Sequence, residues 1–223
     1  MTKKEMLAGI EEIGIIPAVR VGSPEEAIFA SESIFGAGIR VVEITMTTPH
    51  AADVISCLLR KHPNSVLGAG TVLDMATAEI SLDAGASFLT STGLDPDITE
   101  FAQRYEIPLL PGVLTPTEIM AAKRAHARFV KVFPCASMGG PAYIRALRGP
   151  FPDVGFVASG GVTQQTATQY IRAGANILGI GKELLPPDAI RARNTDWIHE
   201  LARRFISMVQ KGRNGNGNDD AVS

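Results

Sequence analysis

The sequence predicts one α/β domain in which eight parallel strands alternate with helices and close into a barrel. Short apolar runs rich in Val, Ile and Leu recur along the chain, the first starting at residue 15 and the eighth at residue 176. These starts are 161 residues apart, so the seven intervals average 23 residues, which suits one strand, one helix and two ordinary loops. Helix-start and helix-end signals fall between the runs.

The eight runs are nearly continuous in apolar character, as in FVKVF at residues 129–133 and ILGIG at 177–181. Such runs are typical of parallel strands that are covered on both faces. The predicted strands begin near Ile15, Ile39, Ser65, Ser87, Pro108, Arg128, Val154 and Asn176.

The segments between the runs carry helix-start and helix-end signals. SPEE at residues 23–26 and TPTE at 115–118 each offer a capping hydroxyl, a proline at the first helical position and a glutamate two residues later, and 48–49 and 95–96 are similar. Glycines that end helices follow at positions 38, 85 and 174.

This repeated unit predicts a (β/α)8 TIM barrel over residues 1–211 as a single domain. An open, doubly wound parallel sheet is the alternative. Residues 212–223 have no apolar period and are expected to form a disordered tail.

Composition narrows the class of ligand. The chain is 45% apolar, and 21 basic residues nearly balance 23 acidic ones, giving a net charge of −2. This balance favours neither nucleic acid nor an anionic membrane as a partner, so a small-molecule ligand is expected. No apolar run reaches the roughly 18 residues of a membrane span and the start lacks a signal-peptide core, which predicts a cytoplasmic protein.

Cysteine and histidine spacing points to neither disulfides nor metal. Cys57 and Cys135 match no paired-cysteine motif, so both are expected to be free thiols. The four histidines show no HExxH spacing, and only His50 falls near a predicted strand end, where it is a poor candidate for a metal ligand.

Active sites of such barrels lie at the carboxyl ends of the strands. Polar residues and glycines gather at the predicted ends, namely Arg20, Glu43, Thr71, Ser91, Thr92, Gly112, Lys131, Ser159, Gly160, Gly161, Gly181 and Lys182.

Lys131 is the candidate nucleophile, because it interrupts an apolar strand and shares a face with Phe129 and Phe133. Desolvation disfavours the charged form of an amine, and a neutral amine can attack a ketone to give a Schiff base. The alternative is a lysine whose stem packs while its ammonium reaches solvent or an acidic partner.

Glu43 is the candidate general acid and base. It ends another predicted strand and shares a face with Val41 and Thr45, so it is expected to point into the barrel. A plain buried ion pair with Lys131 is the alternative.

Gly160, Gly161, Gly181 and Lys182 end the seventh and eighth strands, where barrels commonly bind phosphate on backbone N–H groups. The glycines can also be simple connections. Lys182 can equally be a second candidate nucleophile or a surface lysine.

Five motifs occur in order: VVEIT at residues 41–45, GAGTV at 68–72, LPGV at 110–113, KVFP at 131–134 and GGV at 160–162. Together they resemble the 2-keto-3-deoxy-6-phosphogluconate (KDPG) aldolase family, which includes 4-hydroxy-2-oxoglutarate (KHG) aldolases, from about Ile15 to Leu185.

The resemblance implies a homotrimeric class I aldolase without metal or other cofactor, which cleaves a 2-keto-3-deoxy sugar acid into pyruvate and an aldehyde. By motif, Lys131 matches the Schiff-base lysine and Glu43 the acid and base. Substrate contacts are expected from Arg20, Thr71, Thr92, Phe133 and Ser159, and phosphate contacts from Gly160, Gly161, Gly181 and Lys182.

The chain also departs from the family pattern. Thr47 stands where arginine is usual, Thr92 replaces the proline of an SPG motif, and Lys182 follows the last phosphate glycine where serine is frequent. An aldolase for the galactonate epimer of the substrate, a phosphate-binding barrel isomerase and a non-catalytic scaffold are the alternatives.

Overall fold

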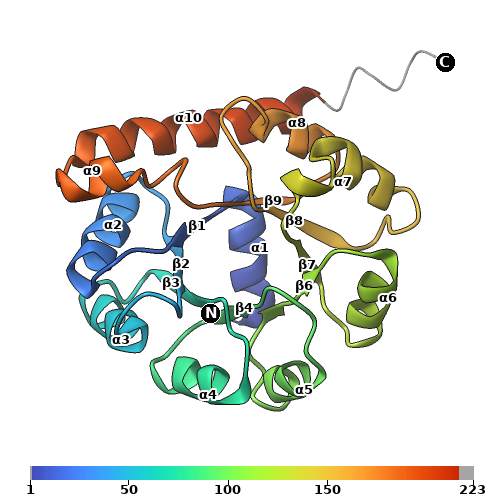
Figure 1. Cartoon of the computed structure of the whole chain (residues 1–223), viewed down its shortest axis with the longest axis horizontal. Helices are drawn as coiled ribbons and strands as arrows, with labels where there is room; N and C mark the ends of the chain where they lie inside the picture. The colour runs from blue at the N-terminus through green and yellow to red at the C-terminus, as the bar shows by residue number, and fades with distance from the viewer. Residues whose placement is uncertain (1, 216–223) are drawn as a thin grey trace.

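The computed structural model describes residues 2–215 as a ring of parallel strands surrounded by helices (Figure 1). Every observed strand begins within two residues of a predicted start, apart from one extra strand discussed below. The strands are β1 (Ile15–Val19), β2 (Val41–Thr45), β3 (Val66–Gly70), β4 (Phe88–Thr90), β5 (Leu109–Leu110), β6 (Gly112–Val113), β7 (Phe129–Val132), β8 (Gly155–Ser159) and β9 (Ile177–Ile180).

The extra strand arises because Pro111 divides one barrel strand into β5 and β6. Proline has no N–H to donate to a ladder, so the pairing changes partner at this residue. Leu110 pairs with β4, whereas Gly112 pairs with β7, and the Pro111 carbonyl accepts the Lys131 N–H at 2.8 Å. The two halves join both edges of the sheet, so the predicted barrel is confirmed and the open sheet is wrong.

Helices lie outside the ring of strands, the first before β1 and the others after later strands. They are α1 (Lys3–Ile13), α2 (Pro24–Gly36), α3 (Ala51–Lys61), α4 (Met75–Asp83), α5 (Pro96–Arg104), α6 (Pro116–Arg124), η1 (Ala136–Met138), α7 (Pro141–Arg148), α8 (Ala167–Arg172), α9 (Pro187–Arg191) and α10 (Thr195–Asn214).

Most predicted caps are confirmed, but the start of α3 differs. Ser23, Asp95 and Thr115 accept backbone N–H groups of the helices that they precede. The cap of α3 is His50 in a left-handed conformation, because the Thr48 hydroxyl bonds back toward the Val19 carbonyl at 3.5 Å instead.

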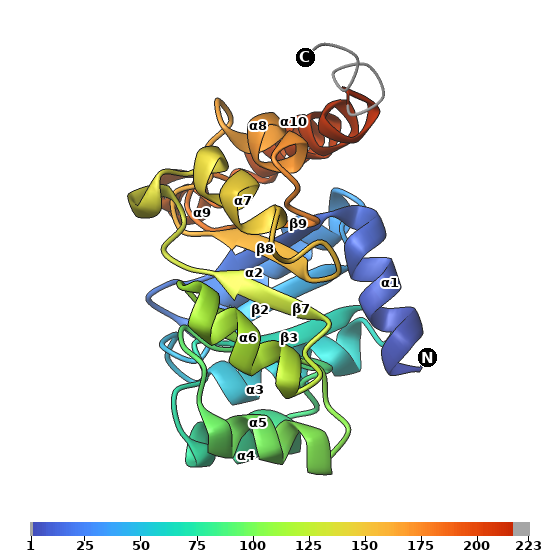
Figure 2. The same ribbon diagram turned by 90° about the vertical axis from the view of Figure 1, so that its right-hand side faces the viewer.

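Helix α1 precedes the first strand and lies across one end of the barrel (Figures 1 and 2). Met6, Leu7 and Ile10 are buried in the same cluster as the lower inward-facing strand residues. These partners are Ile16, Val41, Val66, Phe88, Leu110, Phe129, Val157 and Ile177. The barrel is therefore filled and closed at its N-terminal end, and its carboxyl-terminal end is left for a site.

The last helix extends beyond the predicted boundary of the tail. Helix α10 runs to Asn214, and Gly212 lies so close to α8 that a Cβ there would be 2.6 Å from the Ile171 Cβ. This packing explains why residues 212–214 are helical, whereas the missing apolar period predicted a tail from 212. The rest of that tail, 216–223, lies outside the described residues. Within residues 2–215, no helix is long and apolar enough to cross a membrane.

Candidate active site

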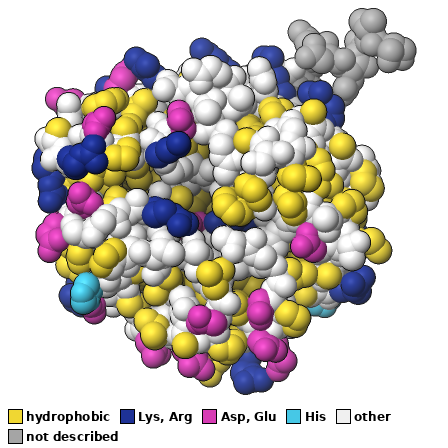
Figure 3. Space-filling model, viewed as in Figure 1, with side chains coloured by type: hydrophobic (Ala, Val, Ile, Leu, Met, Phe, Trp, Pro, Cys, Tyr) yellow, Lys and Arg dark blue, Asp and Glu magenta, His cyan; other side chains and the backbone are white. Residues whose placement is uncertain are grey.

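One cavity of about 840 Å³ opens at the carboxyl ends of the strands, and Figure 3 shows the hollow at the centre of this face. It is lined by every residue that the sequence nominates for catalysis or binding. These are Arg20, Glu43, Thr71, Thr92, Lys131, Phe133, Ser159, Gly160, Gly161, Gly181 and Lys182. The fold thus brings the candidates together from seven different strand ends or the loops that follow them.

Lys131 and Glu43 face each other across the barrel interior. Both are buried, with 7% and 3% of their surfaces exposed, and their closest atoms, Nζ and Oε2, are 3.5 Å apart. A third side chain joins them: the Thr90 hydroxyl donates to Glu43 Oε2 at 2.8 Å, and Lys131 Nζ donates to Thr90 Oγ1 at 3.1 Å. The pair is therefore a continuous hydrogen-bonded chain of lysine, threonine and glutamate.

Glycine in the intervening strand lets Glu43 reach Thr90. Strand β3 lies between β2 and β4, and Gly70 ends β3. A Cβ at position 70 would be 2.0 Å from Glu43 Oε1, so any other residue would displace the carboxylate.

Thr90 is the site residue that sequence reasoning missed. The sequence predicts the polar end of this strand at Ser91 and Thr92, but β4 ends at Thr90. Period-two alternation along the strand could have identified Thr90. Phe88 is buried inside the barrel, and the side chain two residues later points to the same side. Ser91 instead donates to the Gly93 carbonyl and accepts the Gly112 N–H.

The two phenylalanines near Lys131 in the sequence lie at different heights along the barrel axis. Phe129 belongs to the apolar cluster at the closed end of the barrel, whereas Phe133 lines the cavity. The Lys131 Nζ lies 5.9 Å from the centroid of the Phe133 ring, within cation–π range.

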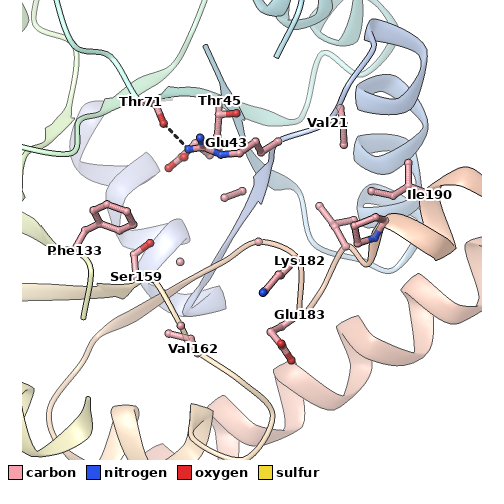
Figure 4. Close-up of a pocket in the computed structure, with 18 of the residues that line it drawn as sticks. Val21, Glu43, Thr45, Thr71, Phe133, Ser159, Val162, Lys182, Glu183 and Ile190 are labelled. Atoms are coloured by element: carbon pink, nitrogen blue, oxygen red, sulfur yellow. Dashed lines mark hydrogen bonds between the residues drawn. The ribbon is translucent and has the colours of Figure 1, made fainter. Parts of the chain in front are cut away.

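Arg20 and Thr71 both line the cavity, and Figure 4 labels Thr71. Arg20 Nη2 donates to Thr71 Oγ1 at 3.1 Å, and Thr71 adopts a left-handed φ of 59° that is unusual for threonine. Thr47, which replaces the usual arginine, is exposed and lies 3.2 Å from the Thr45 hydroxyl. Arg20, unlike Thr47, lines the cavity and offers a guanidinium there.

The glycine loops differ in how strictly they need glycine. Gly160 and Gly161 have φ of 84° and 86°, and a Cβ at 161 would be 2.4 Å from the Ala136 Cβ. Gly181 has ordinary φ, and a Cβ there would meet only the Ala18 carbonyl, at 3.7 Å. Lys182 is exposed at the rim of the cavity beside Glu183 (Figure 4).

The cavity extends past the predicted residues toward α2 and α9. Glu26, Glu183 and Arg191 line this extension. Nothing in their sequence spacing indicates it, because it depends on how α9 packs against α2.

Cys135 lies beneath the site and outside the cavity lining. Its side chain is fully buried, and burial raises the pKa of its thiol to about 11. Burial likewise raises the pKa of the neighbouring Tyr170. Cys135 and the half-buried Cys57 are both free, as predicted.

A closed α/β barrel with a buried lysine linked to a carboxylate at its carboxyl-terminal mouth defines an enzyme of the Schiff-base aldolase class. The chain belongs to the KDPG and KHG aldolase family, whose profile matches residues 7–201. This membership favours neither the isomerase nor the scaffold alternative.

Known proteins of this family resemble the chain over most of its length. It is 34% identical to the 2-dehydro-3-deoxy-phosphogluconate aldolase of Pseudomonas aeruginosa over 204 residues, covering 91% of this chain and 92% of that protein. It is 32% identical to the KHG/KDPG aldolase of Escherichia coli over 192 residues, covering 86% and 90%. The structure of Legionella pneumophila KDPG aldolase, with pyruvate captured as a covalent carbinolamine, matches with a TM-score of 0.82 and 32% identity, covering 87% and 95%.

Proposed function

We propose that this protein cleaves 2-dehydro-3-deoxy-6-phosphogluconate, which is KDPG, to pyruvate and glyceraldehyde 3-phosphate through a Schiff base on Lys131. We also propose cleavage of 4-hydroxy-2-oxoglutarate to pyruvate and glyoxylate. The observation that carries the proposal is the buried Lys131, hydrogen bonded through Thr90 toward Glu43 at the base of the cavity. The names of the similar aldolases and the carbinolamine found in one of them support it.

The chemistry begins when the neutral Lys131 amine adds to the substrate ketone at C2. The resulting carbinolamine loses water to form an imine, which accepts electrons when the C3–C4 bond breaks. Breaking that bond requires removal of the C4 hydroxyl proton and leaves the aldehyde and an enamine. Protonation of the enamine at C3 and hydrolysis of the imine then release pyruvate.

Glu43 is the group proposed to move these protons. Its carboxylate accepts a proton as the amine or the C4 hydroxyl loses one, and returns it to the leaving water or to C3. The burial of Glu43 and its place within 3.5 Å of Lys131 support this role.

The remaining lining residues are proposed to hold the two ends of the substrate. Thr71 and Arg20 would bind the carboxylate next to the reacting ketone, with Phe133 packing on the pyruvyl part and Thr92 and Ser159 offering hydroxyl contacts. Gly160, Gly161 and Gly181 would give backbone N–H groups to the phosphate and Lys182 a positive charge.

Borohydride reduction in the presence of pyruvate tests the mechanism. Reduction of the imine should leave one stable pyruvyl group per chain, and peptide mass spectrometry should place it on Lys131. An adduct on Lys182, or none on any lysine, would contradict the mechanism.

We also propose a cytoplasmic homotrimer. The resemblance to trimeric aldolases supports the trimer. So do two exposed apolar side chains, Leu73 in the loop before α4 and Ile80 within α4. Light scattering coupled to gel filtration should give three times the chain mass, and cell fractionation should place the protein in the cytoplasm. A monomer mass would overturn the trimer.

A further inference from the structure

We propose that Thr90 is a proton relay and positioning residue between Lys131 and Glu43. This inference rests on the proposed Schiff-base function and assigns a further residue to it. Thr90 touches the reacting nitrogen but does not line the cavity, so it would act through Lys131 and not on the substrate.

The distances favour a path through the hydroxyl over a direct path. Lys131 Nζ and Glu43 Oε2 are 3.5 Å apart, which is longer than a good N–H···O hydrogen bond. The two steps through Thr90 Oγ1 are 3.1 Å and 2.8 Å, both within that range. A proton therefore has two short transfers available where one long transfer would be needed.

The directions of the two hydrogen bonds, from Lys131 to Thr90 and from Thr90 to Glu43, determine which way protons can move. The carboxylate of Glu43 can only accept, so the Thr90 hydroxyl donates to it and keeps its lone pairs free. The lysine ammonium can only donate, and it points one N–H at those lone pairs. Each member thus fixes the orientation of the next, as in a fully satisfied buried network.

The proposed transfer balances in protons and charge. The ammonium of Lys131 passes a proton to Thr90 Oγ1 while the hydroxyl passes its own proton to Glu43 Oε2. The products are a neutral amine, an intact threonine hydroxyl and a protonated carboxyl. The amine can then attack the substrate ketone, and the carboxyl can give its proton to the hydroxyl that leaves the carbinolamine.

Burial makes the hydroxyl hard to replace. Thr90 is 1% exposed, and the side chains on either side of it in the chain of hydrogen bonds are 3% and 7% exposed. Thr90 itself is shielded from bulk water, although Lys131 and Glu43 also face the cavity. A side chain of the same shape without a hydroxyl would leave only the 3.5 Å direct contact between amine and carboxylate.

Thr90→Val, which keeps the shape of threonine, tests the relay. In the borohydride assay, the rate of pyruvate imine formation should fall roughly 10- to 100-fold, part of the 10² to 10⁴ typical of general acid and base catalysis. The final extent should remain one pyruvyl group per chain, because Lys131 is still present. For cleavage, kcat should fall with KM unchanged, because Thr90 does not line the cavity.

Rescue and control variants separate a relay from a structural role. Thr90→Ser restores the hydroxyl and should return the trapping rate to within about threefold of the parent protein. Thr168→Val makes the same chemical change in α8, where the hydroxyl donates to the Met208 carbonyl at 3.1 Å, and should leave the rate unchanged. Thr90→Ala gives a second hydroxyl-free variant if the valine variant does not fold.

These experiments distinguish failure of the Thr90 relay from failure of the proposed Schiff-base function. A trapping rate in a folded Thr90→Val or Thr90→Ala variant equal to that of the parent overturns the relay and leaves the Schiff-base function standing. A slow serine variant also overturns it, since the hydroxyl alone would then be insufficient. Failure of the parent protein to trap pyruvate overturns the proposed function and the relay together.

Discussion

Gly70 and Glu43 occupy neighbouring strands so closely that a single added carbon at position 70 would lie 2.0 Å from the Glu43 carboxylate. The Glu43 side chain can therefore cross β3 and reach Thr90 on β4 only because residue 70 has no side chain. This relationship explains the second glycine of the GAGTV motif at residues 68–72.

Gly70→Ala should therefore disable the enzyme without removing any polar group. We expect kcat to fall about 100-fold, on the scale of a displaced general base, and unfolding free energy to fall by about 1–3 kcal/mol from overpacking. Gly9→Ala is the matched control: nothing lies within 4 Å of its added Cβ, and it should stabilise α1 by about 0.5–1 kcal/mol with full activity. Full activity in the Gly70 variant would show that Glu43 tolerates displacement.

Lys131→Met should abolish cleavage and leave the barrel folded. The methionine side chain fills a similar volume, and Glu43 keeps its hydrogen bond from Thr90. Circular dichroism would check the fold while a coupled assay for pyruvate checks activity. Substantial remaining turnover, with pyruvate trapped on Lys182, would transfer the nucleophile to that residue.

Glu43→Gln should lower kcat by about 10² to 10⁴ because the amide cannot take up a proton. The amide oxygen can still accept from Thr90, so the variant should keep its thermal stability within a few degrees. Steady-state cleavage and pyruvate trapping should both slow. Near-normal values of both rates would reduce Glu43 to a structural partner of Lys131.

Lys182→Ala should affect the phosphorylated substrate selectively. Losing a charge-assisted contact of about 1.5 to 3 kcal/mol should lower kcat/KM for KDPG by one to two powers of ten and hardly change it for 4-hydroxy-2-oxoglutarate. Lys123→Ala, on α6 away from the cavity, is the control. Equal losses on both substrates would place Lys182 at the reacting carbons, and no loss on either would make it a surface lysine.

Because Cys135 is buried, we expect the unfolding free energy of the protein to fall at alkaline pH. Burial raises the pKa of its thiol from 9.0 to about 11, so the folded protein holds this proton more tightly than the unfolded chain does. The stability linked to this proton is complete below pH 9 and is lost as the pH rises toward 11. Urea unfolding between pH 8 and 11 should show a smaller loss of unfolding free energy for Cys135→Ala than for the parent protein. Identical pH profiles for the two proteins would contradict this linkage.

The sequence predicts the barrel well because its repeat is local. Apolar runs, capping hydroxyls and helix-ending glycines each report on a few neighbouring residues, and together they locate the strands to within two residues. They also place Lys131 and Glu43 on inward faces, since side chains alternate along a strand.

Features that depend on packing between distant segments escape such reasoning. Alternation from Phe88 indicates that Thr90 points inward, but its contacts with Glu43 and Lys131 join three separate strands and depend on the closed ring. Helix α1 has ordinary amphipathic character, and only the closed ring shows that it covers the barrel floor. The split at Pro111 and the extension of the cavity toward α9 likewise follow from tertiary contacts.

Because α1 closes the N-terminal end of the barrel, the cavity opens at the carboxyl ends of the strands. A substrate attached to Lys131 by its pyruvyl end has its aldehyde-forming end nearer the rim. After carbon–carbon cleavage, the aldehyde blocks the way out for the three-carbon fragment beneath it. Under the proposed mechanism, both this geometry and the covalent bond to Lys131 order product departure: the aldehyde would leave first and pyruvate last, and in the reverse direction pyruvate would have to enter before its partner.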